Sequence, residues 1–147
     1  MTNDANDPLL SAWEAKQPAA LTGDSLWRLN CYREAMFLME LSHADLKVLD
    51  PHPDRAATKD QLYSAVCSVA ANIAEGYGRP TTGDRVRFFS YALGSLREAT
   101  TWYLSFRPTT DVTLINDRIE RLSRIRRMLL GLISRLRTKG GRKFDSW

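Results

Sequence analysis

The sequence predicts an all-α protein, a single domain built as an antiparallel, up-down-up-down four-helix bundle. Four long stretches repeat apolar residues at spacings of three and four, the period of a helix with one buried face. Short stretches rich in proline, glycine or aspartate separate them, and short connections place consecutive helices side by side and antiparallel. No stretch alternates convincingly between polar and apolar residues, so we expect no β-strand.

The first helix begins at Asp24 or Ser25, either of which can cap it, and ends before Pro51. Its packed stripe is expected at Leu29, Tyr32, Met36, Met39, His43 and Leu46. Its other side carries Leu38, Leu41 and Val48. A helix that is apolar on two sides usually has two packing partners, so these three residues are expected to face another subunit.

The turn DPHPD, residues 50–54, leads to a second helix from about Thr58 to Tyr77. Its stripe is Leu62, Val66, Val69, Ile73 and Tyr77. Gly76 and Gly78 end this helix, and Pro80 prevents it from restarting. The alanines 65, 70, 71 and 74 make it thin, which favours close approach of a neighbouring helix.

The third helix begins near Thr82–Asp84 and ends at about Phe106, and the fourth runs from its N-cap Asp111 to about Thr138. Their stripes are Phe89, Ala92, Leu96, Ala99 and Tyr103, and Leu122, Ile125, Leu129, Leu132 and Leu136. We therefore expect a common core of Leu29, Met36, Met39, Ile73, Phe89, Leu96, Leu122, Leu129 and Leu136.

Three regions follow from this reading: a flexible N-terminal arm at 1–23 with a short helix around Leu10–Lys16, the bundle at 24–138, and a basic C-terminal tail at 139–147. The chain has neither a secretory signal pattern nor an apolar run long enough to span a membrane, so we expect a cytoplasmic protein. Cys31 and Cys67 lie in apolar helical patterns, which favours reduced core thiols over a disulfide.

Charge is distributed unevenly along the chain, whose formal net charge is +4. Residues 118–147 hold ten Lys or Arg and two Asp or Glu, a balance of +8, whereas residues 1–60 hold six and ten, a balance of −4. On a helical wheel, Arg121, Arg124, Arg127 and Arg135 point away from the leucine stripe, and Arg137, Lys139, Arg142 and Lys143 continue the positive charge. We expect these residues to bind the backbone of RNA or DNA, without reading its sequence; the alternative is a solvated outer face.

Catalysis is not expected, because the groups that it needs are scarce. The chain has two histidines, and the ExxH pattern at Glu40–His43 occurs once, whereas a di-iron bundle needs two. Cysteine and histidine are not clustered at zinc-binding spacings, so we expect no metal and no cofactor.

A polar cluster offers one alternative function. Ser68, Asn72, Glu75 and Arg79 share one face of the second helix, and Ser95 and Glu98 share a face of the third. These groups either satisfy one another within a close helix contact, with Glu75 and Arg79 paired, or form a small-ligand or enzyme site.

The segment SVAANIAEGYGR at 68–79, followed by FSYALGSLREATT at 89–101, resembles the signature of the family of proteins encoded in 23S rRNA intervening sequences. The resemblance implies a four-helix bundle that assembles into a ring-like pentamer. It also implies kinship with the accessory variability determinants of diversity-generating retroelements, which bind nucleic acid and a reverse transcriptase. The family has no established enzymatic activity, so we expect a non-enzymatic oligomer that binds nucleic acid or acts as a scaffold for a nucleic-acid enzyme such as a reverse transcriptase.

Five side chains are expected to form contacts between subunits of such an oligomer. They are Leu38, Leu41 and Val48 on the first helix and Tyr91 and Trp102 on the third. Stacking of bases on Tyr91 and Trp102 is the alternative for the third helix.

Overall fold

The computed structural model describes residues 7–139, and this part of the chain forms α-helices and short 3₁₀ helices with no β-strand. The all-helical prediction is therefore confirmed. The α-helices are α1 (Pro8–Glu14), α2 (Ala19–Thr22), α3 (Asn30–Asp45), α4 (Ala56–Tyr77), α5 (Thr82–Ser105) and α6 (Val112–Thr138). The 3₁₀ helices are η1 (Ser25–Arg28), η2 (Pro53–Arg55) and η3 (Arg107–Thr109).

Side-chain caps set the starts of two of the four long helices, α5 and α6. The Thr81 hydroxyl accepts a hydrogen bond from the Asp84 backbone N–H at 3.2 Å and so caps α5. Asp111 caps α6 by accepting from the Thr113 N–H at 2.9 Å, as the sequence predicts. Asp24 caps the 3₁₀ helix η1 instead of a long helix, so α3 begins later than predicted, at Asn30.

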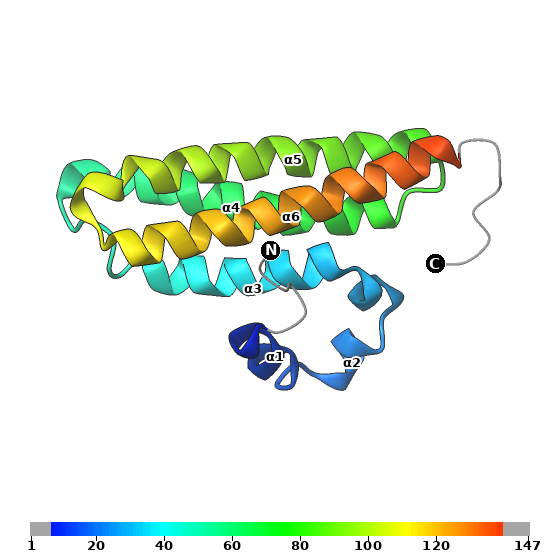
Figure 1. Cartoon of the computed structure of the whole chain (residues 1–147), viewed down its shortest axis with the longest axis horizontal. Coiled ribbons are helices and arrows are strands. Elements are labelled where there is room, and N and C mark those ends of the chain that lie inside the picture. Colours follow the sequence, from blue (N-terminus) through cyan, green and yellow to red (C-terminus); the bar gives the residue numbers. More distant parts are fainter. Residues whose placement is uncertain (1–6, 140–147) are drawn as a thin grey trace.

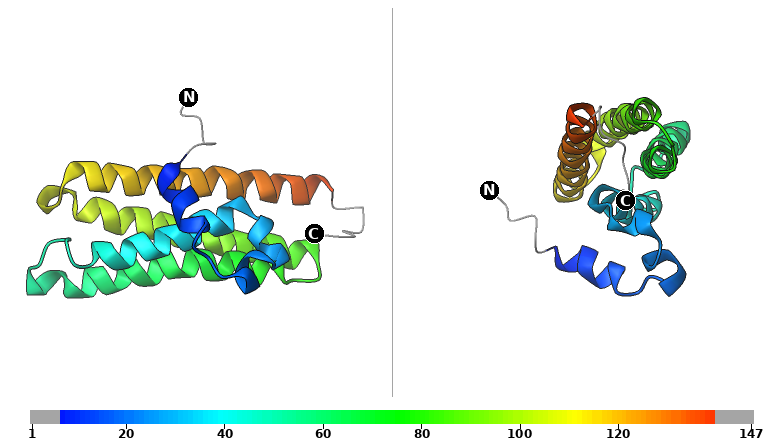
Figure 2. Two further views of the ribbon diagram at one scale, coloured as in Figure 1. Left: turned by 90° about the horizontal axis from the view of Figure 1, so that it is seen from below. Right: turned by 90° about the vertical axis from the view of Figure 1, so that its right-hand side faces the viewer.

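The four long helices lie side by side, and the chain reverses direction from each to the next (Figure 1). α3 contacts α4 and α6, and α5 contacts the same two helices, so each long helix has two long neighbours. Figure 2 shows the four helices end-on, with α1 and α2 outside them next to α3. Within residues 7–139, no helix is both long and apolar enough to cross a membrane.

The core lies between the four long helices. Seven of the nine predicted core residues are buried: Leu29, Ile73, Phe89, Leu96, Leu122, Leu129 and Leu136. Met36 and Met39 are half-buried at its edge. The stripes predicted for α4, α5 and α6 thus face the core.

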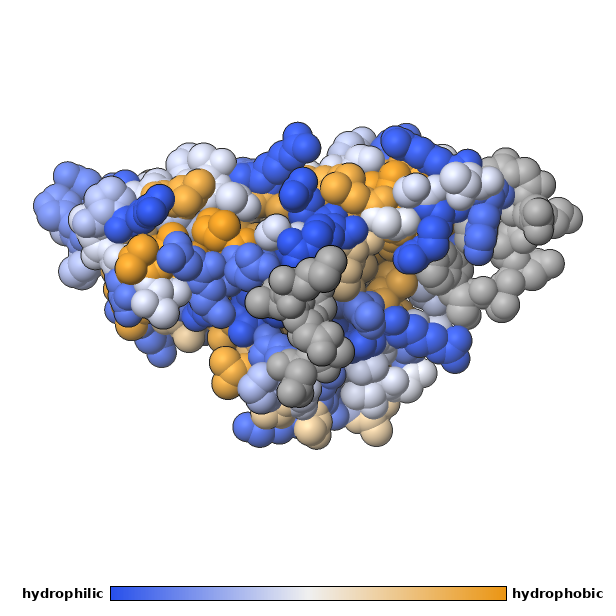
Figure 3. All heavy atoms as spheres, viewed as in Figure 1, coloured by the Kyte–Doolittle hydropathy of each residue, from blue (hydrophilic) through white to orange (hydrophobic). Residues whose placement is uncertain are grey.

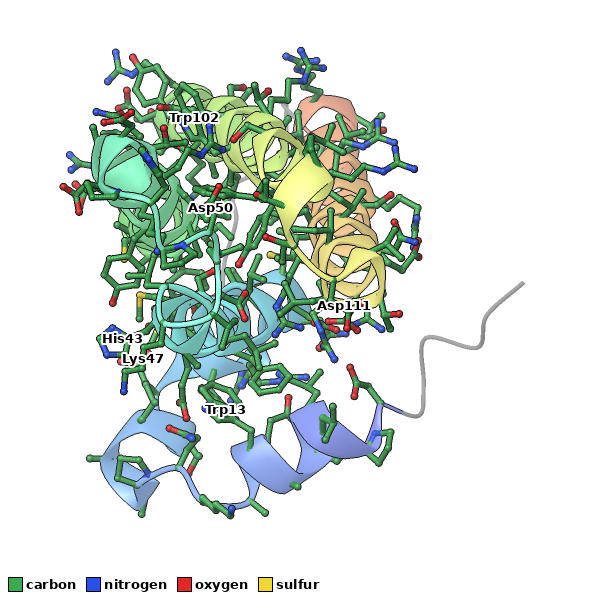
Figure 4. All side chains as sticks on the ribbon, turned by 90° about the vertical axis from the view of Figure 1, so that its left-hand side faces the viewer. Trp13, His43, Lys47, Asp50, Trp102 and Asp111 are labelled. Atoms are coloured by element: carbon green, nitrogen blue, oxygen red, sulfur yellow. The ribbon has the colours of Figure 1, made fainter. Side chains whose placement is uncertain are left out.

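The buried face of α3 differs from the prediction. Leu29 and Tyr32 are buried as predicted, but the buried face then continues through Ala35, Leu38, Ser42, Asp45 and the following Leu49, with Cys31 beside it. Leu38, predicted to face another subunit, is only 1% exposed and lies in the core, whereas His43, predicted for the stripe, is exposed against Tyr63. His43 projects from the outer side of α3, and Lys47, in the turn that follows the helix, projects on the same side (Figure 4).

The N-terminal segment from Asp7 onward is helical and packs on α3, in contrast to the free arm that the sequence predicts. The predicted short helix is present as α1, with Asp7 as its N-cap. Trp13 points from α1 toward α3 (Figure 4) and is 8% exposed. Its ring lies 5.8 Å from that of Trp27 and 5.5 Å from that of Phe37, so α1 is the second packing partner that a two-sided α3 requires.

The thin face of α4 is directed in part at α5. Ala65 and Ala70 are buried, and Gly76 lies so close to α5 that an added Cβ would stand 2.8 Å from a ring carbon of Phe89. Gly76 is therefore needed for this close approach and is still part of the helix, which ends at the C-cap Gly78. Ala71, in contrast, is exposed, so it does not contribute to the helix contact.

Candidate nucleic-acid interface

The arginines of α6 fall into two groups that the helical wheel does not separate. Arg121, predicted to point outward, is only 4% exposed. Its guanidinium lies 5.0 Å above the ring of Phe37 and pairs with Asp7 at 2.6 Å and Asp117 at 2.9 Å. Arg121 is therefore a structural residue that joins α6 to α1 and α3.

Arg118 belongs to the same charged network, one turn before Arg121. It binds the buried carboxylate of Asp45 in a bidentate way, at 2.8 and 2.9 Å, and also pairs with Asp117. Asp45 accepts a further hydrogen bond at 2.7 Å from the hydroxyl of Tyr103, which also contacts Ser42. Burial opposes the charge of Arg118, but the hydrogen bonds and charge of Asp45 raise its pKa.

Arg124 is half-buried and also lies against carboxylates. It is 3.1 Å from Asp7 and 3.4 Å from Glu34, which is itself buried on α3. Burial raises the pKa of Glu34, an effect that the charges of Arg124 and Arg121 oppose. Arg124 is thus at the inner edge of the basic surface and not on its exposed part.

The second group surrounds a groove between the start of α3 and the C-terminal half of α6. This α3–α6 groove has a volume of about 490 Å³. Its lining residues are Arg28, Leu29, Asn30, Cys31, Arg127, Met128, Gly131, Leu132 and Arg135. The three arginines are exposed, so their guanidinium groups can reach a bound anion.

Few carboxylates neutralise these three arginines. Arg127 has an ion pair with Glu120 at 3.6 Å, in which both side chains are about half exposed. Among residues 7–139, neither Arg28 nor Arg135 forms an ion pair. The groove therefore combines a hollow shape with accessible positive charge, which the first group of arginines lacks.

A smaller hollow of about 240 Å³ adjoins the α3–α6 groove and shares Asn30, Arg127 and Met128 with it. Its other lining residues include Asp7 and Glu14 of the N-terminal segment. The basic groove thus continues toward the point where α1 lies against α3 and α6.

Further predicted residues lie beyond the groove. Arg137 and Lys139 are exposed at the end of α6, where hydrophilic side chains gather (Figure 3). Arg142 and Lys143 lie outside the described residues. Sequence reasoning missed Arg28, although it is a basic residue directly before an apolar helix, as well as the exposed Arg126.

The polar cluster of α4 and α5 does not converge on one point. The amide of Asn72 donates to the Ser68 carbonyl at 2.9 Å within α4, and Glu75 pairs with Arg79, which directly follows the C-cap of the same helix. Glu98 accepts from the Trp102 indole at 3.3 Å, within α5. Ser95 is half-buried on the same helix. These contacts stabilise each helix locally and give no support to a shared ligand site.

The residues predicted for subunit contacts are exposed to different degrees. Val48 is 63% exposed and Tyr91 is 53% exposed, whereas Leu41 and Trp102 are half-buried. Leu104, Val112 and Leu130 are additional exposed apolar residues on α5 and α6. Apolar patches over these two helices are visible in Figure 3.

Other chemically reactive groups are not arranged as a site. Both cysteines are free, and burial raises the pKa of the Cys31 thiol to about 11. Cys31 is thus a core thiol as predicted, whereas Cys67 is half-buried. In the described part of the chain, no three His, Cys, Asp or Glu side chains are grouped so that they could hold a metal ion.

Comparison with known proteins identifies one family. Residues 28–131 match the model of the 23S rRNA-intervening sequence protein family. The solved structure of a protein of unknown function from the S23 ribosomal protein family of Bacteroides thetaiotaomicron VPI-5482 resembles this chain with a TM-score of 0.65 at 16% identity. The resemblance covers 70% of this chain and 97% of that one and, at this identity, concerns the fold alone. No curated protein matches the chain.

Proposed function

Since this chain belongs to the family of 23S rRNA-intervening sequence proteins, we propose that it binds the phosphate backbone of RNA or DNA through the α3–α6 groove and has no catalytic activity of its own. The observation that carries this proposal is the contrast between the two groups of arginines. Arg118, Arg121 and Arg124 are neutralised by carboxylates, whereas Arg28, Arg127 and Arg135 surround an open groove.

The chemistry of these side chains favours phosphate over other ligands. A guanidinium presents its donors in a planar fork that matches two oxygens of a phosphate. Phosphate contacts release counterions from the nucleic acid, so they provide affinity without reading sequence. The rest of the groove lining is largely apolar and carries few groups that could distinguish bases.

A salt titration of a groove variant tests the proposal. Arg127→Glu with Arg135→Glu should weaken binding of both a mixed-sequence RNA and a duplex DNA. It should also flatten the slope of log K against log salt by about two units for the duplex, roughly one per lost phosphate contact. Neither arginine is in the core, so the helix content should not change.

The matched control is Arg97→Glu with Arg107→Glu. Both residues are exposed, and the change in net charge is the same, but neither lines the α3–α6 groove. If the control weakens binding as much as the groove variant, attraction is general and the groove is not the site. Absence of binding by the wild-type protein at low salt would contradict the proposed function itself.

We also propose that the four long helices form an antiparallel up-down-up-down bundle that assembles into a homo-oligomer. The alternating chain direction and the two long neighbours of each helix support the bundle. Exposed apolar residues on α5 and α6, with Tyr91, Leu104 and Leu130 among them, support subunit contacts. The family resemblance implies five copies.

Sedimentation velocity tests the assembly. The wild-type protein should sediment as an oligomer at tens of micromolar, roughly the concentration needed to detect weak association. Leu104→Glu with Leu130→Glu should shift it toward the monomer, because a charge buried in an apolar contact is unfavourable. A wild-type monomer would contradict this part of the proposal.

A further inference from the structure

The N-terminal segment, residues 7–22, holds arginines beside the α3–α6 groove with its own carboxylates. One oxygen of Asp7 lies 2.6 Å from Arg121 and 3.1 Å from Arg124. Glu14, seven residues later, pairs with Arg33 of α3 at 2.7 Å. All three arginines belong to the family-matched region 28–131, whereas both carboxylates lie outside it.

Asp7 is bound firmly in this position. Its second oxygen accepts hydrogen bonds from the backbone N–H groups of Leu9 and Leu10, at 3.0 and 3.2 Å, and so caps α1. Burial on its own would raise the pKa of Asp7, but the hydrogen bond and charge of Arg121, the Leu10 N–H and Arg124 lower it to about 2. The carboxylate is therefore charged at neutral pH.

Trp13 is the apolar anchor of the same segment. It packs on Trp27 and Phe37, and its indole N–H donates to the Glu40 carboxylate at 2.5 Å. Arg121 also lies over the ring of Phe37. The apolar anchor is therefore continuous with the charged contacts of the segment.

We infer that the N-terminal segment is an intramolecular competitor for the anion that binds the α3–α6 groove. The Asp7 carboxylate occupies a place between Arg121 and Arg124 that a phosphate of a longer nucleic acid would take. The smaller hollow lined by Asp7, Glu14 and Arg127 connects that place with the groove. This inference rests on the proposed function, and it assigns a regulation to the same site.

Competition has two physical consequences. While the segment is bound, a nucleic acid can reach Arg28, Arg127 and Arg135 but has to displace Asp7 to contact Arg121 or Arg124. Variants that weaken the bound segment should therefore raise the apparent affinity, because a larger fraction of the protein is competent to bind. They should also make the salt dependence steeper, since additional phosphate contacts form.

Two variants weaken the segment in independent ways. Asp7→Asn removes the charge but keeps the helix cap, because asparagine caps a helix about as well as aspartate. Trp13→Ala removes the apolar anchor without changing any charge. The matched control is Asp24→Asn, which gives the same change in net charge at the cap of η1, where no arginine pairs with the carboxylate in the described residues.

Binding of a 20-nucleotide mixed-sequence RNA, measured as a function of salt, compares the four proteins. We expect the affinity of Asp7→Asn and of Trp13→Ala to rise roughly threefold to tenfold, with a salt slope steeper by about one unit, and Asp24→Asn to resemble the wild type. An equal gain in Asp24→Asn, or a gain in Asp7→Asn alone, would overturn the inference, because the effect would then be one of charge and not of displacement.

The position of the segment can be observed directly in the wild-type protein. The indole N–H resonance of Trp13, assigned by its absence in Trp13→Phe, should shift when the RNA saturates the protein, because the hydrogen bond to Glu40 is lost. An unchanged resonance at saturation would overturn the inference and leave the proposed function intact. If none of the four proteins binds RNA at low salt, both are wrong.

Discussion

Replacement of Gly76 by alanine tests the close contact between α4 and α5. An added Cβ would stand 2.8 and 2.9 Å from two ring carbons of Phe89 and 3.1 Å from the Cβ of Phe88. Phe89 is 1% exposed and packed on all sides, so its ring has little room to move away. The backbone of α4 would therefore have to shift from α5.

The expected magnitude follows from two opposing effects. Adding a methyl group to a packed core costs about 1–3 kcal/mol. Alanine in place of glycine within a helix contributes about 0.5–1 kcal/mol in the other direction. We therefore expect Gly76→Ala to lower the free energy of unfolding by about 0.5–2 kcal/mol. For a chain of this size, that corresponds to a decrease in Tm of roughly 2–6 °C.

Gly94 and Gly131 provide matched controls for the same substitution. Both lie inside long helices, α5 and α6, and an added Cβ at either position meets no atom within 4 Å. Gly94→Ala and Gly131→Ala should therefore raise the free energy of unfolding by about 0.5–1 kcal/mol. Urea unfolding monitored by circular dichroism measures all three variants. The reasoning is refuted if Gly76→Ala is stabilised as much as the controls.

Two further predictions concern the buried charges. Tyr103→Phe should lower the free energy of unfolding by about 1–3 kcal/mol, because Ser42 and Asp45 each lose a hydrogen-bond partner at 2.7 Å. Urea unfolding at pH 7 measures this loss. Unchanged stability would contradict the prediction and mean that water replaces the hydroxyl. The depressed pKa of Asp7 predicts stability that is present above about pH 4 and is lost as pH falls through its folded value of about 2, an effect on the order of 1–2 kcal/mol. Acid titration of thermal stability should show less of this decline in Asp7→Asn, and an identical decline would contradict it.

The stripes of α4, α5 and α6 could be predicted from the sequence because each of these helices has one continuous apolar face that dominates its pattern. α3 is apolar on two sides, since Phe37 packs on Trp13 of α1 while Leu38 packs in the core. Periodicity identifies both sides but does not state which one meets the long helices. Which side of α3 meets the long helices depends on where α1 packs. Those contacts form between segments that are distant in the sequence, so periodicity within α3 does not contain them.

Arg121 illustrates the same limit for charge. Its partner Asp7 is 114 residues away in the sequence, so neither local charge counts nor a helical wheel could reveal the ion pair. The wheel places Arg121 outside the leucine stripe, and that geometry is compatible with burial only because Asp7, the N-cap of α1, and Phe37 of α3 lie against it. An arginine beside an apolar stripe is therefore exposed only if no further element packs there.

The antiparallel arrangement of α3 and α6 explains why accessible charge is confined to one end of α6. Asp45, at the end of α3, meets Arg118 near the start of α6, and Glu34 meets Arg124 farther along. Closer to its own start, α3 carries no further acidic residue and is preceded by Arg28, which faces the groove with Arg135. Carboxylates of α3, together with Asp7 and Asp117, thus neutralise the arginines in the first half of α6, and the arginines farther along have no acidic counterpart on α3. Positive charge gathered in this way at one end of the molecule supports the proposed binding of a polyanion over that of a small ligand.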